Sequence, residues 1–346
     1  MRTRIKDIAD RVGVSVSLVS MYLNHHPLSA RISEQTKRRI DEAVRELHYT
    51  PSATARSLKM GRSRTLGLVI SEIARVYSSF LTQCLMDEAE RHGYQLLLSL
   101  THYDRQKELE SLRNLVSRQA DGILYHLHLP VDEPPPAFVQ NVPLLLYSPH
   151  PACNAVYLNE RDCFLRLFEI LSQRGFRRVL CVHEGLPLNA GLASECARGF
   201  PLDIAAMQCR SLPELIDAAA APHTCLVFFS SVLARHFLRH CQERGLHDLP
   251  PFVYSYTLPY DLIESPKVIY AMIRPLRTFV TTAMERLVEM VERPQPTIRH
   301  IPLHVDLMSP EQLREHYLRQ LEDPYYGIIV REHLGGIPHT HTLSSI

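Results

Sequence analysis

The stretch Ile5-Lys6-Asp7-Ile8-Ala9-Asp10-Arg11-Val12-Gly13-Val14-Ser15 decides how the N-terminal part of this chain folds. Its apolar residues recur at positions i, i+3, i+4 and i+7, which is the pattern of one buried helix face. Gly13 ends this helix, and Ser15 is a favourable N-cap for a second one. The second helix should point Val19 and Leu23 inward. We expect its outward face, which suits a DNA groove, to carry Ser17, Ser20, Met21 and Asn24.

A third helix is predicted to begin after the N-cap Ser33. Its buried side should carry Thr36, Ile40, Ala43, Val44 and Leu47. Two short helices joined by a glycine turn and braced by a third form a helix-turn-helix, whose second helix enters the major groove of DNA. A plain three-helix bundle would show the same stripe, so the pattern alone leaves both interpretations open.

The distribution of charge favours the DNA-binding interpretation. Residues 1–64 hold thirteen Lys and Arg against six Asp and Glu, which makes this segment +7. The whole chain is only +1, so the remainder carries −6. Such an asymmetry is typical of a segment that contacts phosphates.

Residues 49–64 predict a hinge. Pro51 stands at the first position of a possible helix that ends at Leu58, where its fixed φ and missing N–H are tolerated. This helix is too short to be stable alone, so we expect it to fold on docking. Leu58, flanked by Arg56, Arg62 and Arg64, would then wedge into the minor groove beside phosphate contacts. The alternative is an ordinary interdomain linker.

These residues resemble the LacI/GalR family of bacterial transcriptional regulators. The motifs that carry the resemblance in the head are Ile5-Lys6-Asp7-Ile8-Ala9, Gly13 to Ser20, Leu23-Asn24, Arg31-Ile32-Ser33, Tyr49-x-Pro51 and Ala55-Arg56-Ser57-Leu58. A weaker resemblance continues almost to residue 308, for example at Arg64-Thr65-Leu66-Gly67, Ala120-Asp121-Gly122-Ile123, Gly175-Phe176-Arg177-Arg178 and Arg274-Pro275. Residues 309–346 match no part of the family pattern.

The resemblance implies which residues contact DNA. Base edges would be faced by Val16, Ser17 and Met21. Phosphate or sugar would be approached by Thr3, Ser15, Ser20, Asn24, Arg31 and Ser33. The hinge would contribute Ala55, Arg56 and Leu58. Met21 departs from the family pattern, which usually has Arg there, and it cannot make the bidentate guanine contact worth about 1–3 kcal/mol. We therefore expect an altered half-site and more specificity from DNA shape.

Beyond Gly61 the pattern changes to apolar runs that alternate with helical stretches. The expected strands are Leu66 to Ile70, Leu96 to Leu98, Ile123 to Tyr125, Leu144 to Tyr147, Val179 to Val182, Cys225 to Phe229 and Phe252 to Tyr254. The expected helices are Phe80 to His92, Arg105 to Arg118, Asp162 to Arg174, Val232 to Arg244 and Arg277 to Glu292. Strand and helix in alternation predict doubly wound α/β layers, and about 240 residues exceed one typical domain.

The predicted architecture is a helix-turn-helix domain over residues 1–48, the hinge over 49–64 and a type I periplasmic-binding-protein-like core over 65–308. The first lobe of the core would comprise about 65–160 and 275–293, and the second about 161–274 and 294–308. Because the stretch after Phe200 is shorter than the family pattern, we expect the second lobe to lack one helix. Residues 309–346 should form an amphipathic helix, packed on the core or on a dimer mate, and a mobile tail.

The cleft between the lobes departs furthest from the family pattern. The positions that hold charged or bidentate ligand contacts in the family carry Ser148-Pro149, Asn159-Glu160, Cys196, Ser230-Ser231 and Tyr256-Thr257 in this chain. Together with Glu72, Tyr147 and Tyr254 they form the expected pocket. Such a pocket offers few partners for a polyhydroxyl ligand, and each unpaired polar group costs roughly 1–3 kcal/mol. We expect either a small aromatic or apolar effector rather than a simple sugar, or no effector.

Other features exclude competing classes. The eight cysteines show no metal-ligand spacing, and His339-Thr340-His341 lies in a Gly-rich tail, so we expect free thiols and no metal or cofactor. No segment has the length and apolarity of a membrane span or the pattern of a signal peptide, which favours the bacterial cytoplasm and nucleoid. No nucleophile is paired with a base, so an enzyme is not predicted. A solute-binding sensor with a tethering head is disfavoured by the +7 charge of the head.

The combined prediction is a homodimeric transcriptional regulator, a repressor in the first instance, that binds a pseudo-palindromic double-stranded DNA operator. An effector in the cleft would shift the lobe arrangement and thereby the spacing of the paired hinges. The alternative within the same class is a ligand-independent regulator with a vestigial cleft.

Overall fold

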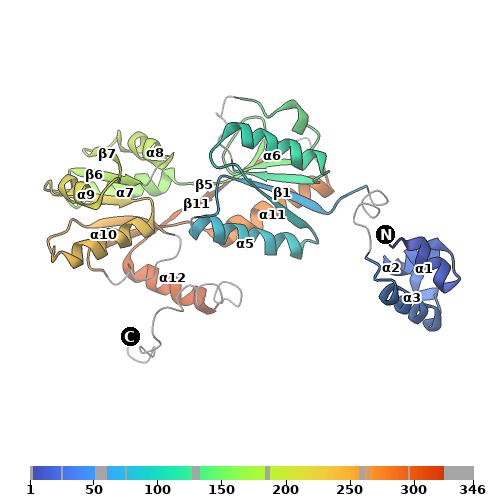
Figure 1. Cartoon of the computed structure of the whole chain (residues 1–346). Coiled ribbons are helices and arrows are strands. Elements are labelled where there is room, and N and C mark those ends of the chain that lie inside the picture. Colours follow the sequence, from blue (N-terminus) through green and yellow to red (C-terminus); the bar gives the residue numbers. More distant parts are fainter. Residues whose placement is uncertain are drawn as a thin grey trace. The chain divides into compact units, whose positions relative to one another are not determined.

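The computed structural model of the 346-residue chain describes residues 3–24, 26–50, 61–74, 76–126, 133–183, 188–256, 262, 265–294 and 297–322. The chain divides into two compact units, residues 1–65 and 66–346. We describe each unit by itself (Figure 1). The predicted hinge helix and the residues after Glu322, including His339 and His341, lie outside the described residues.

The first unit is a small helical head whose elements follow the sequence prediction. They are α1 (Ile5–Val12), α2 (Val16–Leu23), the 3-10 helix η1 (Pro27–Arg31) and α3 (Glu34–Glu46). Gly13 adopts a φ of 75° and closes α1, a conformation that favours glycine. Its core consists of Ile8, Ala9, Val12, Val19, Ile40 and Ala43. The predicted order of helix, glycine turn, helix and bracing helix is therefore confirmed.

The second unit begins with a lobe built on a six-stranded sheet of order β11-β5-β4-β3-β1-β2. Its strands are β1 (Thr65–Ile70), β2 (Gln95–Leu100), β3 (Gly122–Tyr125), β4 (Leu144–Leu146), β5 (Asn154–Asn159) and β11 (His300–His304). Its helices are α5 (Val76–Arg91), α6 (Arg105–Ser117), the short η2 (Ala137–Val139) and α11 (Leu276–Glu292). The neighbours from β1 through β11 pair in parallel.

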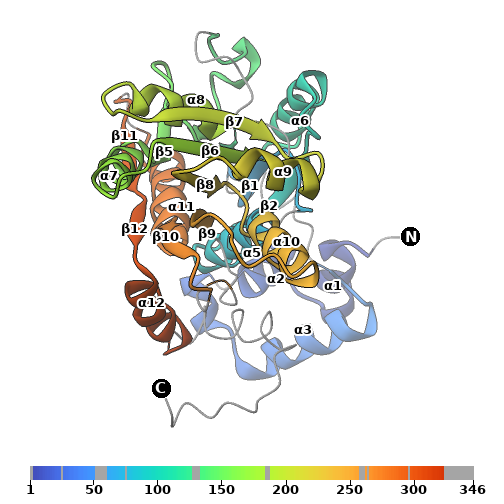
Figure 2. The same cartoon turned by 90° about the vertical axis from the view of Figure 1, so that its left-hand side faces the viewer.

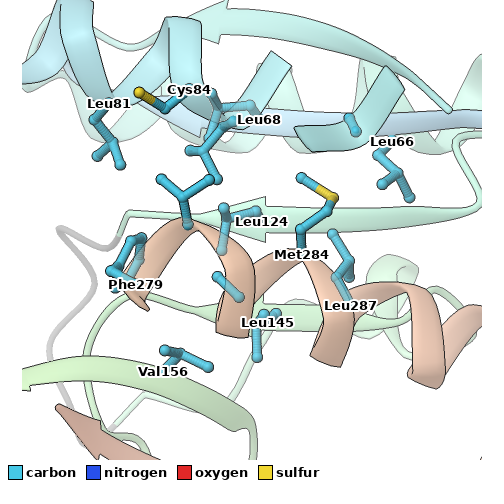
Figure 3. Close-up of a cluster of buried hydrophobic side chains, with 14 of the residues drawn as sticks. Leu66, Leu68, Leu81, Cys84, Leu124, Leu145, Val156, Phe279, Met284 and Leu287 are labelled. Atoms are coloured by element: carbon cyan, nitrogen blue, oxygen red, sulfur yellow. The ribbon is translucent and has the colours of Figure 1, made fainter. Parts of the chain in front are cut away.

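The first lobe buries apolar side chains on both faces of its sheet. On one face, Leu68, Leu124 and Leu145 pack against Phe279 and Met284 of α11 and against residues of α5 (Figure 3). A second cluster lies under α6 on the other face. At Gly122 a Cβ atom would lie 2.8 Å from Val291, so glycine lets α11 approach β3 closely.

The second lobe carries another six-stranded sheet, of order β12-β10-β9-β8-β6-β7. Its strands are β6 (Arg178–His183), β7 (Asp203–Gln208), β8 (Thr224–Phe228), β9 (Phe252–Tyr256), β10 (Val268–Ile273) and the antiparallel β12 (Asp306–Met308). Its helices are α7 (Arg161–Gln173), α8 (Leu188–Ala197), α9 (Leu212–Ala219), α10 (Ser231–Glu243) and α12 (Pro310–Glu322). α7 and α8 cover one face, and α9, α10 and α12 cover the other (Figure 2).

Helices on both faces of two parallel sheets confirm the predicted doubly wound α/β lobes. Five strands were not predicted: β5, β7, β10, β11 and β12. Most side chains of β5, β7 and β11 are partly or fully exposed and β12 has only three residues, so these four lack the continuous apolar run of a central parallel strand. β10 does have such a run, from Val268 to Ile273.

The stretch after Phe200 carries no helix, as expected: α8 ends at Ala197, before Gly199-Phe200 and Pro201, and the chain then enters β7 at Asp203. One prediction about the lobe boundaries is wrong. Residues 294–308 do not all belong to the second lobe, because β11 pairs with β5 in the first-lobe sheet, with Ile301 opposite Val156. The chain crosses to the second lobe only at Val305, and β12 follows. Which sheet an edge strand joins depends on contacts with segments far away in the sequence, so the strand's own residues do not specify it.

The C-terminal helix α12 packs on its own second lobe. Leu313 is fully buried in the apolar cluster under α10, with Met308 and Tyr317 against it. The sequence predicted that this helix packs on the core or on a dimer mate, and the structure shows it on the core.

Candidate DNA-binding head and effector cleft

The outer face of α2 has the composition that the sequence predicts. Val16, Ser17 and Asn24 are exposed, Ser20 and Met21 are half-buried, and Val19 between them is fully buried. The Asn24 amide donates to the Ser20 carbonyl at 2.7 Å and to the Ser20 hydroxyl at 3.2 Å. Asn24 therefore closes the C-terminal end of α2 as well as lying on its outer face.

Three of the residues expected near phosphate also hold the head together. The Ser15 hydroxyl accepts from the Leu18 amide at 3.2 Å and caps α2. The Ser33 hydroxyl caps α3 in the same way. The Thr3 hydroxyl donates to the Leu47 carbonyl at 2.8 Å, so the start of the chain is held against the end of α3. A capped helix N-terminus still presents further N–H groups, which favour an anion.

One contact that orients α2 was not predicted. The Tyr22 hydroxyl donates to Asp41 at 2.9 Å and ties α2 to α3. Desolvation by burial, followed by this hydrogen bond and the charge of Asp41, raises the pKa of Tyr22. No sequence spacing signals a pair nineteen residues apart on two helices. Arg31 is exposed at the end of η1, whereas Ala55, Arg56 and Leu58 lie outside the described residues.

The first lobe contains a pocket at the carboxyl ends of its strands, where ligands of doubly wound sheets bind. It encloses about 70 Å³. Leu68, Leu81 and Leu124 are among the apolar residues that line it. Its polar lining is Ser71, Glu72, Tyr77, Ser78, Tyr103, His126 and Tyr147. Glu72 and Tyr147 were predicted cleft residues, and the structure brings them together here.

A chain of polar contacts lies beside this pocket. Two nitrogens of Arg274 donate to one oxygen of Glu160, at 3.0 and 3.2 Å. The Arg274 guanidinium lies 5.3 Å from the centroid of the Tyr77 ring, and the Tyr77 hydroxyl forms a hydrogen bond with that of Tyr147. The Tyr147 ring in turn packs against Phe279 at 4.4 Å between centroids. These residues connect the first lobe to two segments that cross between the lobes.

Burial dominates the electrostatics of these contacts. It raises the pKa of Tyr77 and raises the pKa of Tyr147 well above its ordinary value, so both phenols are neutral at physiological pH. Burial, the largest single cause, lowers the pKa of Arg274, but the charge and hydrogen bond of Glu160 together with the electrostatic interactions with Tyr77 and Tyr147 outweigh it, so the net shift is upward. The sequence contained both partners, in Asn159-Glu160 and Arg274-Pro275, but a pairing across 114 residues has no local signal.

The other predicted cleft residues do not converge on this pocket. Asn159 and Ser230 act at helix starts: the side-chain oxygen Oδ1 of Asn159 accepts from the Arg161 backbone amide, and the Ser230 hydroxyl accepts from the Leu233 amide. Ser148 is half-buried next to Tyr147. Tyr256 ends β9, and its side chain lies outside the described residues.

The prediction that Cys196 and Tyr254 line the cleft is wrong. Cys196 lies in the apolar core between α7 and α8, where burial raises the pKa of its thiol. Tyr254 is fully buried on the opposite face of the same sheet, among the residues under α10. Cys196 is on the side of α8 that packs against α7, and Tyr254 is on a strand covered on both faces, which buries its side chains alternately on the two sides.

All eight cysteines carry free thiols, and seven of them are buried. Within the described ranges no three His, Cys, Asp or Glu side chains gather as a metal site would require. In the same ranges, none of the helices combines the length and apolarity needed to span a bilayer.

Comparisons with known proteins give matches to the helical head and to the two-lobed core. The model of the bacterial regulatory proteins of the lacI family matches residues 4–52. The sucrose operon repressor of Klebsiella pneumoniae is 32% identical over 172 residues, which cover 50% of this chain and 52% of that protein. The HTH-type transcriptional repressor PurR of Edwardsiella ictaluri is 35% identical over 120 residues, 35% of this chain and 34% of that protein. The chain thus matches about half the length of these relatives, or less.

The fold is shared over a longer stretch. The crystal structure of the Lac repressor dimer bound to operator and the anti-inducer ONPF superposes with a TM-score of 0.74 at 18% identity, covering 89% of this chain and 98% of that one. At this level of identity the likeness concerns the fold alone.

Proposed function

Because this chain belongs to the lacI family of bacterial regulatory proteins, we propose that it is a sequence-specific transcriptional repressor that binds operator DNA as a dimer and works in the bacterial cytoplasm. The observation that carries the proposal is the head itself, in which α2 presents an exposed face on a fixed three-helix frame. The +7 charge of residues 1–64 supports it, because neutralised phosphates supply much of the affinity for DNA.

In the proposed complex α2 enters the major groove. Val16, Ser17 and Met21 contact base edges, since Val16 and Ser17 are exposed and Met21 is half-buried on α2. Arg31 and the capped N-termini of α2 and α3 approach phosphates, together with Thr3, Ser20 and Asn24. The hinge residues Ala55, Arg56 and Leu58 would contact the centre of the site, with Leu58 opening a base step.

A dimer interface is proposed on the edge of the first lobe. β2 is the outermost strand of its sheet, so its edge has no neighbour within the described residues. Leu97 and Leu98 on β2 and Met86 on the adjacent α5 are exposed, Met86 at 47%. A second copy that covers these apolar side chains would place two heads on the two half-sites of a pseudo-palindrome.

Control by a ligand would act through the cleft between the lobes. A compound that binds one lobe arrangement better than another shifts the population and hence the affinity for the operator. The pocket of the first lobe encloses only about 70 Å³ and has several leucines in its lining, so we propose that the effector is not a simple sugar. The Glu160–Arg274 pair favours a second candidate, a regulator whose lobes are held without any ligand.

The test is a selection from randomised duplexes with the full-length chain, followed by fluorescence anisotropy at two salt concentrations. We expect a two-fold symmetric site and an affinity that falls steeply with salt. Binding without sequence preference would contradict the proposed sequence-specific regulator. Selection of the standard family half-site at the base pair facing Met21 would contradict the altered half-site.

A further inference from the structure

The first-lobe pocket has a composition that points to the charge of its ligand. Among the described residues that line it, Glu72 is the only acid, and no lysine or arginine occurs. Three tyrosines, Tyr77, Tyr103 and Tyr147, share the lining with it. A carboxylate with several aromatic rings attracts a cation, because the ring faces and the phenol oxygens both carry partial negative charge.

The neighbouring contacts already show this preference. The Tyr77 ring carries the Arg274 guanidinium 5.3 Å from its centroid, so one side of this tyrosine is a cation site within the chain. Glu160 neutralises that guanidinium at 3.0 Å, so Arg274 adds little net positive charge to the pocket beside it. The high pKa values of Tyr77 and Tyr147 keep both phenols neutral, and their oxygens remain able to accept hydrogen bonds.

The size and the floor of the pocket limit the ligand further. The pocket of about 70 Å³ admits a ligand of only a few heavy atoms, since a cavity about twice as large, of about 150 Å³, binds one benzene. Leu68, Leu81, Leu85 and Leu124 form an apolar surface that suits a short aliphatic chain. Such a surface offers no hydrogen-bond partners to the hydroxyl groups of a sugar.

We propose that this pocket binds a small aliphatic ammonium compound, with the ammonium at Glu72 and the tyrosines and the carbon chain on the leucine floor. This inference rests on the proposed function, of which it names the effector class: an amine would be the signal that the repressor senses. An ammonium group adds the attraction of opposite charges to its hydrogen bonds with a carboxylate; a neutral alcohol of similar shape donates a hydrogen bond without that charge, and a carboxylate analogue is repelled.

The experiment titrates the full-length chain by calorimetry at pH 8 with three compounds of similar shape, small enough for the pocket: ethylammonium, ethanol and acetate. The titrations extend into the millimolar range, because a ligand of so few atoms makes few contacts. Ethylammonium should bind about tenfold more tightly than the other two, because only its hydrogen bond to the carboxylate joins opposite charges. Glu72→Gln should abolish this preference, and Tyr103→Leu, at an exposed ring, should weaken it.

The matched control is Glu90→Gln, an exposed glutamate farther along α5, which should leave the preference unchanged. Equal or tighter binding of acetate or ethanol, binding of none of the three, or an unchanged preference in Glu72→Gln would each overturn the inference. Operator affinity of the same samples separates it from the proposed function: a chain that binds ethylammonium but no operator refutes the repressor, and one that binds operator without an effect of ethylammonium refutes its role as effector.

Discussion

At the scale of single residues, the head shows side chains that serve the fold and the proposed DNA contact together. Ser15 and Ser33 cap α2 and α3 with hydroxyls that also lie at the helix ends expected near phosphates. Their loss would therefore weaken the head as well as its affinity, since an N-cap contributes about 1 kcal/mol. Met21 is different, because it is half-buried on the outer face of α2 and has no capping role.

Met21→Arg is expected to change specificity more than stability. An arginine at this place can donate two hydrogen bonds to guanine, which is worth about 1–3 kcal/mol of discrimination, or roughly tenfold and more in affinity. Anisotropy on paired duplexes that differ at this base pair measures the effect. Gln35→Arg on α3 is the control, because it adds the same charge at an exposed position and should raise affinity for all duplexes alike. Equal gains in both variants would mean that Met21 does not face a base.

The buried ion pair in the core gives a second prediction at this scale. Glu160→Gln leaves Arg274 without its carboxylate in a mostly buried place, with side-chain exposure of only 8% and 19% for the two partners. Removal of one partner of a buried pair costs on the order of 3 kcal/mol. Urea unfolding of the core measures it, and the double variant with Arg274→Gln should recover part of the loss. Glu195→Gln removes the partner of Arg161 in an exposed pair and should leave stability unchanged.

At the scale of elements, α12 shows how a segment outside the family pattern joins the core. Its sequence is amphipathic, and the structure places its apolar side against β10 and β12. Leu313 is fully buried there, whereas Leu318 on the same helix is 45% exposed. The helix therefore extends the second-lobe core, and its removal would uncover apolar surface next to α10.

The two leucines of α12 form a matched test of this packing. Leu313→Ala should destabilise the second lobe by about 2–5 kcal/mol, because it leaves a cavity in a closed core. Leu318→Ala should change the free energy of unfolding by less than about 0.5 kcal/mol, as exposed positions usually do. Chemical denaturation of both variants is the measurement. Equal losses would show that α12 is not docked as described.

At the scale of the whole molecule, the proposed repressor needs two heads at a fixed spacing, which only a dimer provides. The exposed side chains of Met86, Leu97 and Leu98 lie on neighbouring elements of the first lobe. Burial of such side chains contributes about 25 cal/mol for each Å² of apolar surface removed from water. An interface there would stabilise the dimer without any contribution from the DNA.

Leu97→Asp is expected to dissociate the dimer, because it would bury a charge in an apolar interface. Sedimentation should then show a folded monomer, and operator affinity should fall by more than tenfold as the two heads lose their linkage. Leu246→Asp is the control, since Leu246 has similar exposure, 37%, but follows α10 on the second lobe. If Leu97→Asp leaves the dimer intact and Leu246→Asp dissociates it, the interface lies on the second lobe.

The sequence by itself determined the head and the alternating layers of the core. A helix of eight residues such as α1 depends on contacts between neighbours in sequence, so its apolar spacing, Gly13 and the caps Ser15 and Ser33 suffice to predict it. The same holds for the central strands, whose continuous apolar runs signal burial on both faces. The resemblance to the family pattern indicated Glu72 and Tyr147 as cleft residues at strand ends.

Only the tertiary structure decided which of these residues meet. The Glu160–Arg274 pair, the stacking of Arg274 on Tyr77 and the Tyr22–Asp41 bond join residues far apart in sequence, and no period or spacing records such contacts. The lobe that receives β11 and the burial of Cys196 and Tyr254 were likewise settled by pairing and packing between elements. The physical reason is that secondary structure follows from interactions within a few residues, whereas a pocket forms where separate elements converge.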